Sequence, residues 1–240
     1  KEVVKITDDL EKIGSKIIEA GGLEIRDVDN GEEPFLYSSG NHGPGYVMIK
    51  GLVGQPSVLK YLTGQLAHKI VDEEIYKEFD FIAGNATGGM IPGWQLRNDL
   101  EELTGMEIPY VYVRETRKLG GHKELITGNR KNPLIKPGDK ALVFEELVNF
   151  AETTTNSALV LREAGYHADV AATILYYNNP KAQELLDNTK VTLTYLIGLP
   201  DLINVAEETG KFGERAVKSY RDFLASPVKW QLDRGYELPK

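Results

Sequence analysis

The sequence predicts an α/β protein built on a mostly parallel, doubly wound sheet. Five short runs rich in aliphatic, β-branched and aromatic residues recur along the chain, and segments with helical periodicity separate most of them. Such alternation is typical of buried parallel strands that helices cover on both faces of the sheet. The chain has 240 residues, of which 41% are hydrophobic and 27% charged, and this suits one domain with a sizeable core.

The elements are predicted in order from the N-terminus. TDDLEKIGSKIIEAGG predicts an amphipathic helix, because Thr7 or Asp8 can cap its start and Gly21 ends it. PSVLKYLTGQLAHKIVDEEI predicts a second helix, with Pro56 in its first turn. The predicted strands are FDFIAG, IPYVYV, KALVFEE, ADVAATILYY and VTLTYLIG, and predicted helices lie at 91–104, 155–164 and 180–187. A further helix over 216–224 precedes a C-terminal extension.

Composition narrows the classes of function. The net charge of −8 disfavours non-specific binding to nucleic acid or anionic membranes, because their phosphates repel a net anion. The chain has no cysteine, which excludes disulfides and thiolate chemistry and fits a reducing compartment. No apolar run approaches the roughly 18 residues that span a bilayer, and no signal-peptide pattern opens the chain. We therefore expect a cytoplasmic protein that binds neither nucleic acid nor a membrane.

The segment AGNATGGMIPG, residues 83–93, lies between a predicted strand and a predicted helix. Its glycines Gly84, Gly88 and Gly89 let the backbone turn sharply and point amides inward, where the helix N-terminus favours an anion. No Gly-Lys-Ser/Thr follows, so this is not a Walker loop. The segment predicts either an anion-binding loop or an ordinary tight turn between strand and helix.

The segment RETRKLGGHKELITGN, residues 114–129, follows the next predicted strand. Arg114, Arg117 and Lys118 place three cations in five residues, and Gly120-Gly121 follows them. Cations on a flexible glycine hinge suit a lid that closes over a charged leaving group and excludes water. The alternative is an exposed hairpin with solvated charges. The position at the carboxyl edge of the predicted sheet, where α/β proteins bind ligands, favours the lid.

Two adjacent carboxylates, Glu145 and Glu146, end the predicted strand KALVFEE. Paired acids at this place commonly bind a magnesium-bearing ligand or the two hydroxyls of a ribose. The alternative is an acidic turn that complements the dipole of the next helix. Because the pair lies on the strand side of the loop, the ligand-binding interpretation is favoured.

These three segments, in this order, resemble the type I phosphoribosyltransferases, and among them the orotate phosphoribosyltransferases most. The similarity runs from about Phe35 to about Leu202. FLYSSGNHGPGYVMIKG is similar to the family's N-terminal hood, IAGNATGGMIPG to its diphosphate loop and YVRETRKLGGHKELITG to its catalytic lid. ALVFEELVNFAETTTNSALVLREAG is similar to the motif that binds phosphoribosyl pyrophosphate (PRPP), and TYLIGLPDLI to the closing strand and short helix.

The resemblance implies transfer of the phosphoribosyl group from PRPP to a pyrimidine-type base such as orotate, with release of pyrophosphate. Lys118, Glu145 and Glu146 would serve catalysis, and Mg²⁺ would be held through the pyrophosphate, with the two glutamates as candidate protein ligands. The resemblance assigns the pyrophosphate to Asn85, Ala86, Thr87, Gly88, Arg114, Arg117 and His122, the 5′-phosphate to Asn149, Phe150, Ala151, Glu152 and Thr153, and the base to Ser39, Gly40 and Tyr177.

The resemblance also implies an organisation. Residues 1–240 would form a single domain, with a hood from about 1–55, a core from about 56–205 and a helical tail over 206–240. Two copies would form a homodimer in which the lid reaches the neighbouring site, and the other partners would be small nucleotide precursors.

The phosphate loop departs from the family pattern Thr-x-Gly-x-Thr/Ser, because here it reads NFAET. Ala151 replaces the glycine and restricts a backbone that needs a positive φ. Glu152 adds a negative charge beside the expected phosphate, and at ~4 Å two like charges cost roughly 1 kcal/mol in water and about 4 at an intermediate dielectric. Both acids of the pair are glutamate, although the family pair normally contains aspartate.

The base-binding positions depart as well. Ser38 stands where the family has a lysine, Tyr177 where it has the arginine that recognises the orotate carboxylate, and Asn149 where it has a threonine. A second hypothesis therefore stays open beside the enzyme: a catalytically inactive phosphoribosyltransferase-like protein with a nucleotide-binding, regulatory or structural role.

Overall fold

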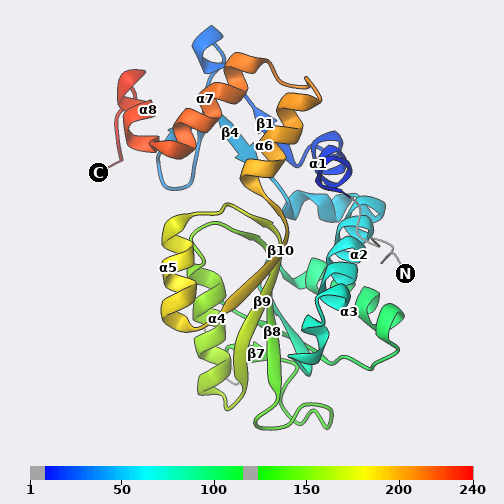
Figure 1. Ribbon diagram of the computed structural model, residues 1–240. Coiled ribbons are helices and arrows are strands. Elements are labelled where there is room, and N and C mark those ends of the chain that lie inside the picture. Colours follow the sequence, from blue (N-terminus) through cyan, green and yellow to red (C-terminus); the bar gives the residue numbers. More distant parts are fainter. Residues whose placement is uncertain (1–8, 116–123, 240) are drawn as a thin grey trace. The chain divides into compact units, whose positions relative to one another are not determined.

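The computed structural model describes residues 9–115 and 124–239. The chain forms two compact units, the first made mainly by residues 49–200 and the second by residues 10–48 together with 201–239. Figure 1 shows the helices and strands of both. Among the described residues, no helix is both long and apolar enough to cross a membrane.

The first unit contains a six-stranded sheet in the order β10-β9-β8-β5-β6-β7. Its strands are β5 (Phe81–Asn85), β6 (Tyr110–Val113), β7 (Ile126–Thr127), β8 (Lys140–Val148), β9 (His167–Tyr176) and β10 (Thr192–Gly198). Neighbouring strands run parallel, except that β7 pairs antiparallel with β6 at the edge. The predicted mostly parallel sheet is confirmed.

Helices cover both faces of this sheet, so the predicted doubly wound architecture is also confirmed. Figure 1 shows α2 and α3 on one face and α4 and α5 on the other. The helices of this unit are η2 (Lys50–Gly54), α2 (Pro56–Asp72), η3 (Ile75–Lys77), α3 (Met90–Thr104), α4 (Glu152–Glu163) and α5 (Pro180–Thr189). Because both faces are covered, every residue of the central strand β5 is buried.

The order of the strands locates a crevice. From β5 the chain passes through α3 to β6 on one side, whereas from β8 it passes through α4 to β9 on the other side. Since β5 and β8 are neighbours, their carboxyl ends diverge at a switch point, which is where open α/β sheets bind ligands.

Two boundaries differ from those predicted around the acid pair. Strand β8 continues past Glu146 to Val148, because β9 is long enough to pair with it up to Tyr176. Helix α4 begins at Glu152 rather than at residue 155. The residues between them, 149–151, form a much tighter connection than the sequence predicts.

The second unit combines two small hairpins with helices from both ends of the chain. It contains α1 (Leu10–Glu19), β1 (Leu23–Ile25), η1 (Val28–Asn30), β2 (Phe35–Leu36), β3 (His42–Gly43), β4 (Gly45–Val47), most of α6 (Leu199–Glu208), α7 (Glu214–Ala225) and α8 (Pro227–Asp233). Strand β1 pairs antiparallel with β4, and β2 with β3. Helix α7 packs so closely on β4 that a Cβ on Gly45 would lie 2.3 Å from the Tyr220 ring. The hood segment and the tail therefore share one core.

Candidate active site

A cavity of about 420 Å³ lies at the carboxyl ends of β5 and β8. It is lined by Lys50, Ala86, Thr87, Gly88, Glu115 and all ten residues from Glu145 to Thr154. A second cavity of about 330 Å³ shares part of this lining and adds Arg114 and the first turns of α4. The structure thus brings together the glycine loop, the start of the basic segment and the acid pair, as the parallel sheet predicts.

The acid pair stands on β8 beside the end of β5. The Asn85 side chain donates a hydrogen bond from Nδ2 to Oε2 of Glu145, at 2.7 Å. Burial, followed by the neighbouring Glu146 carboxylate, raises the pKa of Glu145 to about 9, and the bond from Asn85 offsets only part of this rise. Burial beside a second carboxylate thus favours the protonated form of Glu145. A ligand that brings positive charge to the pair would displace that proton.

The carboxylate of Glu146 lies close against the backbone of Gly88 in the glycine loop. A Cβ on Gly88 would lie 2.0 Å from Oε1 of Glu146, so the loop approaches the carboxylate through bare backbone. Oε2 of Glu146 and Oδ1 of Asn85 are buried and have no hydrogen-bond partner among the described residues. Unpaired buried acceptors are costly, about 1–3 kcal/mol each, and are satisfied by a donor or a cation.

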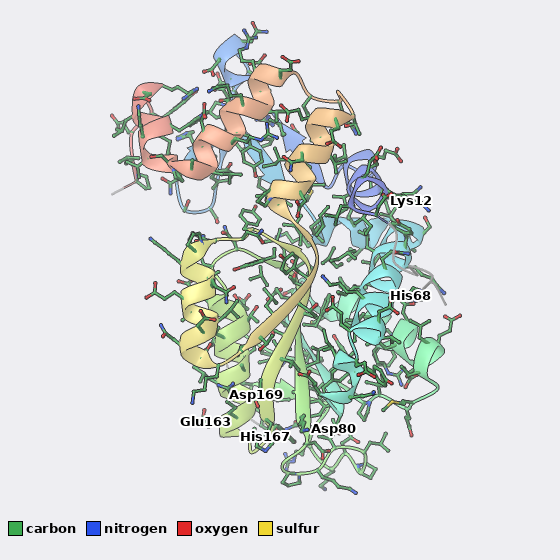
Figure 2. All side chains as sticks on the ribbon, viewed as in Figure 1. Lys12, His68, Asp80, Glu163, His167 and Asp169 are labelled. Carbon is green, nitrogen blue, oxygen red and sulfur yellow. The ribbon has the colours of Figure 1, made fainter. Side chains whose placement is uncertain are left out.

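These acceptors suit the hydroxyls of a sugar or a divalent cation that brings other ligands with it. Among the described residues, no group of three or more histidines and carboxylates could hold a metal ion by itself. Figure 2 labels His68 on α2 and His167 at the start of β9. The start of β9 is the end of that strand opposite to the carboxyl ends that line the cavity. A hard cation such as Mg²⁺ would therefore need oxygens from the substrate and water, as it commonly does in phosphate-binding sites.

The phosphate loop has a positive φ at Ala151, the position where the family has a glycine. Ala151 lies in the left-handed region, at φ 64° and ψ 9°, which costs a residue with a Cβ about 1–2 kcal/mol. Its conformation turns the chain from β8 directly into α4. The first amides of α4 have no acceptor within the helix, and together with the helix dipole they form an anion-binding end. The expectation that position 151 needs a positive φ is correct.

Glu152 lies in the first turn of α4 and lines both cavities. Its side chain is exposed, so water screens its charge and the cost beside a phosphate falls near the lower figure, roughly 1 kcal/mol. Of the neighbouring hydroxyls, Thr155 is used within the helix, because its Oγ1 donates to the Ala151 carbonyl at 2.8 Å.

Arg114 extends from the end of β6 into the second cavity. Its guanidinium donates from Nη2 to the Tyr112 hydroxyl at 2.9 Å and from Nε to the Thr127 hydroxyl at 3.2 Å. These bonds fix its orientation at the base of the basic segment. Arg117, Lys118 and His122, the other basic residues assigned to the lid, lie outside the described residues.

The residues assigned to the base are not gathered in this cavity. Ser39 and Gly40 belong to the second unit. Tyr177 follows β9, is half-buried, and donates its backbone N–H to the Val148 carbonyl at 2.9 Å. Asn149 lines the cavity, and its Oδ1 accepts a hydrogen bond from Nδ2 of Asn179 at 3.3 Å.

Lys50 is a cavity residue that sequence reasoning missed. It begins η2, its side chain is exposed, and it is the one cation of the described part of the chain that lines the larger cavity. The same cavity also receives Glu115, the acidic residue next to Arg114. No motif singles out Lys50, because its place at the cavity follows from tertiary packing.

Comparison with known proteins shows which family has this arrangement. The chain is 30% identical over 209 residues to the orotate phosphoribosyltransferase of Listeria monocytogenes serovar 1/2a, covering 87% of this chain and 94% of that protein. It is 28% identical over 201 residues to the Bacteroides thetaiotaomicron enzyme of the same name, with coverage of 84% and 89%. This chain belongs to the orotate phosphoribosyltransferase family. A scan against profiles of protein families finds no match.

Solved structures agree with this family at the level of the fold. Orotate phosphoribosyltransferase from Aeropyrum pernix superimposes with a TM-score of 0.61 at 21% identity, covering 82% of this chain and 99% of that chain. The UMP synthase of Leishmania donovani superimposes with a TM-score of 0.70 at 19% identity, and the match covers 91% of this chain and 42% of that longer one. The family resemblance seen in the motifs is therefore confirmed.

The strained loop makes a prediction for Ala151→Gly. Glycine relieves the left-handed strain but loses a buried methyl and gains unfolded-state freedom, so we expect the free energy of unfolding to change by less than about 0.5 kcal/mol. Ala158→Gly, at a buried position inside α4, is the matched control and should lower it by roughly 1 kcal/mol or more. Equal losses in urea denaturation of the two variants would contradict the strain at Ala151.

The raised pKa of Glu145 makes a prediction about pH. An unfolded chain releases this proton near pH 4.5 but the folded protein holds it until about pH 9, so its contribution to stability falls as pH rises through that window. Glu145→Gln removes this titration. By the linkage relation, the free energy of unfolding of the variant, relative to that of the natural protein, should rise steadily between roughly pH 5.5 and roughly pH 8.5.

Chemical denaturation across that range measures the effect. Glu152→Gln, the same substitution at an exposed position of the same cavity, is the matched control. If the difference between Glu145→Gln and the natural protein does not depend on pH, Glu145 does not hold the proton.

Proposed function

We propose that this protein transfers the phosphoribosyl group of PRPP to orotate, with release of pyrophosphate. Membership of the family supports this reaction, and one observation carries it for this chain. A single cavity is bounded by the half-buried Glu145 and the buried Glu146, a bare glycine loop and the N-terminus of α4. These three parts match the hydroxyls, the diphosphate and the 5′-phosphate of PRPP.

In the proposed reaction, the bond from the anomeric carbon to the diphosphate oxygen breaks while a ring nitrogen of the base bonds to that carbon. The proton of that ring nitrogen passes to the departing pyrophosphate. Positive charge develops on the sugar, and the Glu145–Glu146 pair would stabilise it while binding the hydroxyls. Negative charge develops on the departing pyrophosphate, where Arg114, Lys118 and the amides of residues 86–88 would receive it. Mg²⁺, when bound, would neutralise part of the same charge.

The other proposed contacts complete the site. Residues 149–153 would hold the 5′-phosphate, and the basic segment, including Arg117 and His122, would close over the pyrophosphate and exclude water. Ser39 and Gly40 of the hood, with Tyr177, would bind the base. The protein would work in the cytoplasm on small nucleotide precursors.

We further propose a homodimer. Ile91 and Trp94 lie one turn apart on α3 and are 59% and 49% exposed, which is unusual for two large apolar side chains on one helix face. A second copy of the chain would cover them and bring its basic segment to the neighbouring site. Sedimentation as a monomer at the concentration used in the activity assay would contradict this assembly.

The inactive alternative rested on Ala151 and Glu152 in the phosphate loop and on Ser38 and Tyr177 at the base-binding positions. Ala151 adopts the left-handed conformation that the loop needs, and the Glu152 side chain is exposed. Both loop changes are therefore compatible with a bound phosphate, whereas Ser38 and Tyr177 do not line either cavity.

Conversion of orotate and PRPP to orotidine 5′-monophosphate and pyrophosphate in the presence of Mg²⁺ tests the proposal. We expect Lys118→Ala to lower kcat by about 100-fold or more, because it removes a cation from the transition state, while the Kd for PRPP changes less than about tenfold. Lys136→Ala, an exposed lysine that does not line either cavity, is the control. A natural protein that neither binds PRPP nor turns over orotate would contradict the proposed function.

Lys50 makes a separate prediction. Because it lines the larger cavity beside four glutamates, we expect Lys50→Ala to weaken PRPP binding by about tenfold or more, the usual cost of losing one charged hydrogen bond. Lys60→Ala, an exposed lysine on α2, should leave binding unchanged. Calorimetric titration with PRPP and Mg²⁺ measures both, and equal affinities would show that Lys50 does not contact the ligand.

A further inference from the structure

The turn that carries Ser39 and Gly40 is held by its own backbone. It connects β2 to β3, and its ends are closed by bonds from the Tyr37 amide to the Asn41 carbonyl at 2.8 Å and from the Gly40 amide to the Tyr37 carbonyl at 2.9 Å. Gly40 has a φ of 82°, which favours glycine at this position. The Ser39 hydroxyl oxygen accepts a hydrogen bond from Nδ2 of Asn41 at 3.0 Å.

Gln231, nearly two hundred residues later in the chain, extends this arrangement from α8. Its side chain is fully buried. Its Oε1 accepts from the His42 amide at 2.8 Å, and its Nε2 donates to Oδ1 of Asn41 at 3.2 Å. A hydrogen-bonded relay therefore runs from Gln231 through Asn41 to Ser39. Since Asn41 already donates to the Ser39 oxygen, the serine O–H is left to donate elsewhere.

Aromatic stacking fixes the same C-terminal segment against the turn. The Tyr236 ring stacks on His42, with centroids 4.9 Å apart and planes 17° apart, and the Trp230 ring also stacks on Tyr236, at 6.1 Å and 6°. The last described residue of the chain, Pro239, comes so close to the turn that a Cβ on Gly40 would lie 3.1 Å from it. The segment thus contacts the turn at three points.

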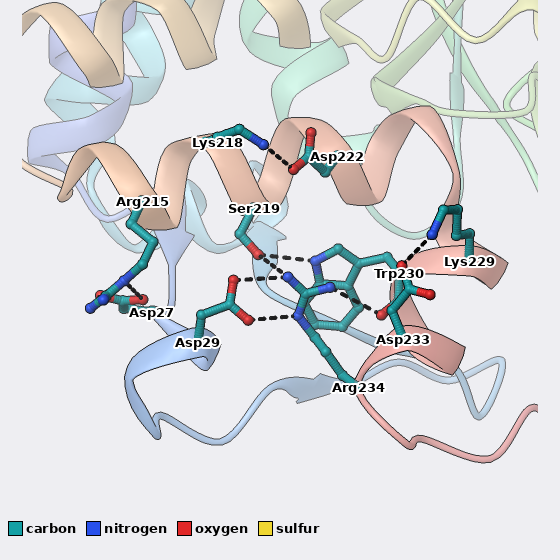
Figure 3. A network of polar contacts seen from close by, with 10 residues as sticks. All are labelled: Asp27, Asp29, Arg215, Lys218, Ser219, Asp222, Lys229, Trp230, Asp233 and Arg234. Atoms are coloured by element: carbon teal, nitrogen blue, oxygen red, sulfur yellow. Dashed lines mark hydrogen bonds and ion pairs between the residues drawn. The ribbon is translucent and has the colours of Figure 1, made fainter.

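The segment is itself anchored to the hood and to α7. Figure 3 shows Arg234 bound by both oxygens of Asp29, at 2.8 Å each, with its guanidinium over the Trp230 ring at 4.3 Å. Trp230 is 2% exposed, and its Nε1 donates to the Ser219 hydroxyl at 3.0 Å. A bidentate pair and a buried indole hold α8 in one orientation. The position of Gln231, the first residue of the hydrogen-bonded relay to Ser39, is therefore fixed.

We propose that the C-terminal segment 226–239 positions the base-binding turn, with Gln231 and Tyr236 as the positioning residues. The inference rests on the proposed function, which assigns Ser39 and Gly40 to the base. Through Asn41, Gln231 orients the Ser39 hydroxyl so that its O–H faces an acceptor oxygen of the base, a carbonyl or a carboxylate. The segment sets the affinity for the base and not that for PRPP, whose proposed contacts lie in the first unit.

Steady-state kinetics with each substrate varied in turn tests this role. We expect Gln231→Ala and Tyr236→Ala each to raise the KM for orotate by about fivefold or more, the usual effect of losing one such contact, with the KM for PRPP changed less than about twofold. Tyr236→Phe keeps the stacked ring and should restore the KM for orotate. Lys229→Ala, on the same helix and 72% exposed, is the control and should match the natural protein.

Amide hydrogen exchange adds a readout that does not depend on turnover. In Gln231→Ala the His42 amide loses its acceptor, so its exchange should quicken while the amides of β8 keep their protection. If the natural protein is active and the variants change neither the KM for orotate nor the exchange at His42, the positioning role is wrong and the proposed function stands.

Other outcomes are equally decisive. Equal rises in KM for both substrates would mean that the segment only stabilises the protein, and this would overturn the inference. Absence of orotate turnover in the natural protein would overturn the proposed function, and with it the role of the segment in base binding.

Discussion

The carboxyl pair Glu145–Glu146 near the end of β8 is the constraint on which the rest of the site depends. Two adjacent glutamates beside Asn85 lie where the sheet is covered on both faces, and the proton held by Glu145 is what makes that burial tolerable. The loop opposite meets the pair through a glycine, because a Cβ on Gly88 would have to displace the Glu146 carboxylate. A glycine loop and an acid pair that looked independent in the sequence are thus one structural unit.

The sequence predicted the parts of the molecule that depend on local pattern. Apolar runs between helical segments predicted the parallel sheet, and the rule that carboxyl ends of parallel strands meet at one edge predicted that residues 86–88 and 145–153 would line one cavity. The end of β8 was predicted less well, because its extension to Val148 depends on pairing with β9. Lys50 was missed, because its place at the cavity follows from tertiary packing alone.

The two departures in the phosphate loop, Ala151 and Glu152, carry different free-energy costs. Ala151 carries a backbone cost of about 1–2 kcal/mol, which the tight turn from β8 into α4 imposes whether or not a ligand is bound. Glu152 carries an electrostatic cost that solvent screens at its exposed position. Neither fills the cavity. The association of the C-terminal segment with the hood turn could not be predicted, since stacking of His42 on Tyr236 joins parts of the chain that no local pattern connects.

The most direct test of this account is the number of protons released when PRPP binds with Mg²⁺. Calorimetry in buffers of different ionisation enthalpy measures the number of protons released. The experiment is done near pH 8, roughly one unit below the pKa of Glu145, where the protonated form of this carboxyl is still favoured in the free protein. The account predicts release of about one proton by the natural protein and markedly less by Glu145→Gln. Binding without proton release, or the same release by both proteins, would contradict the claim that the acid pair receives the ligand.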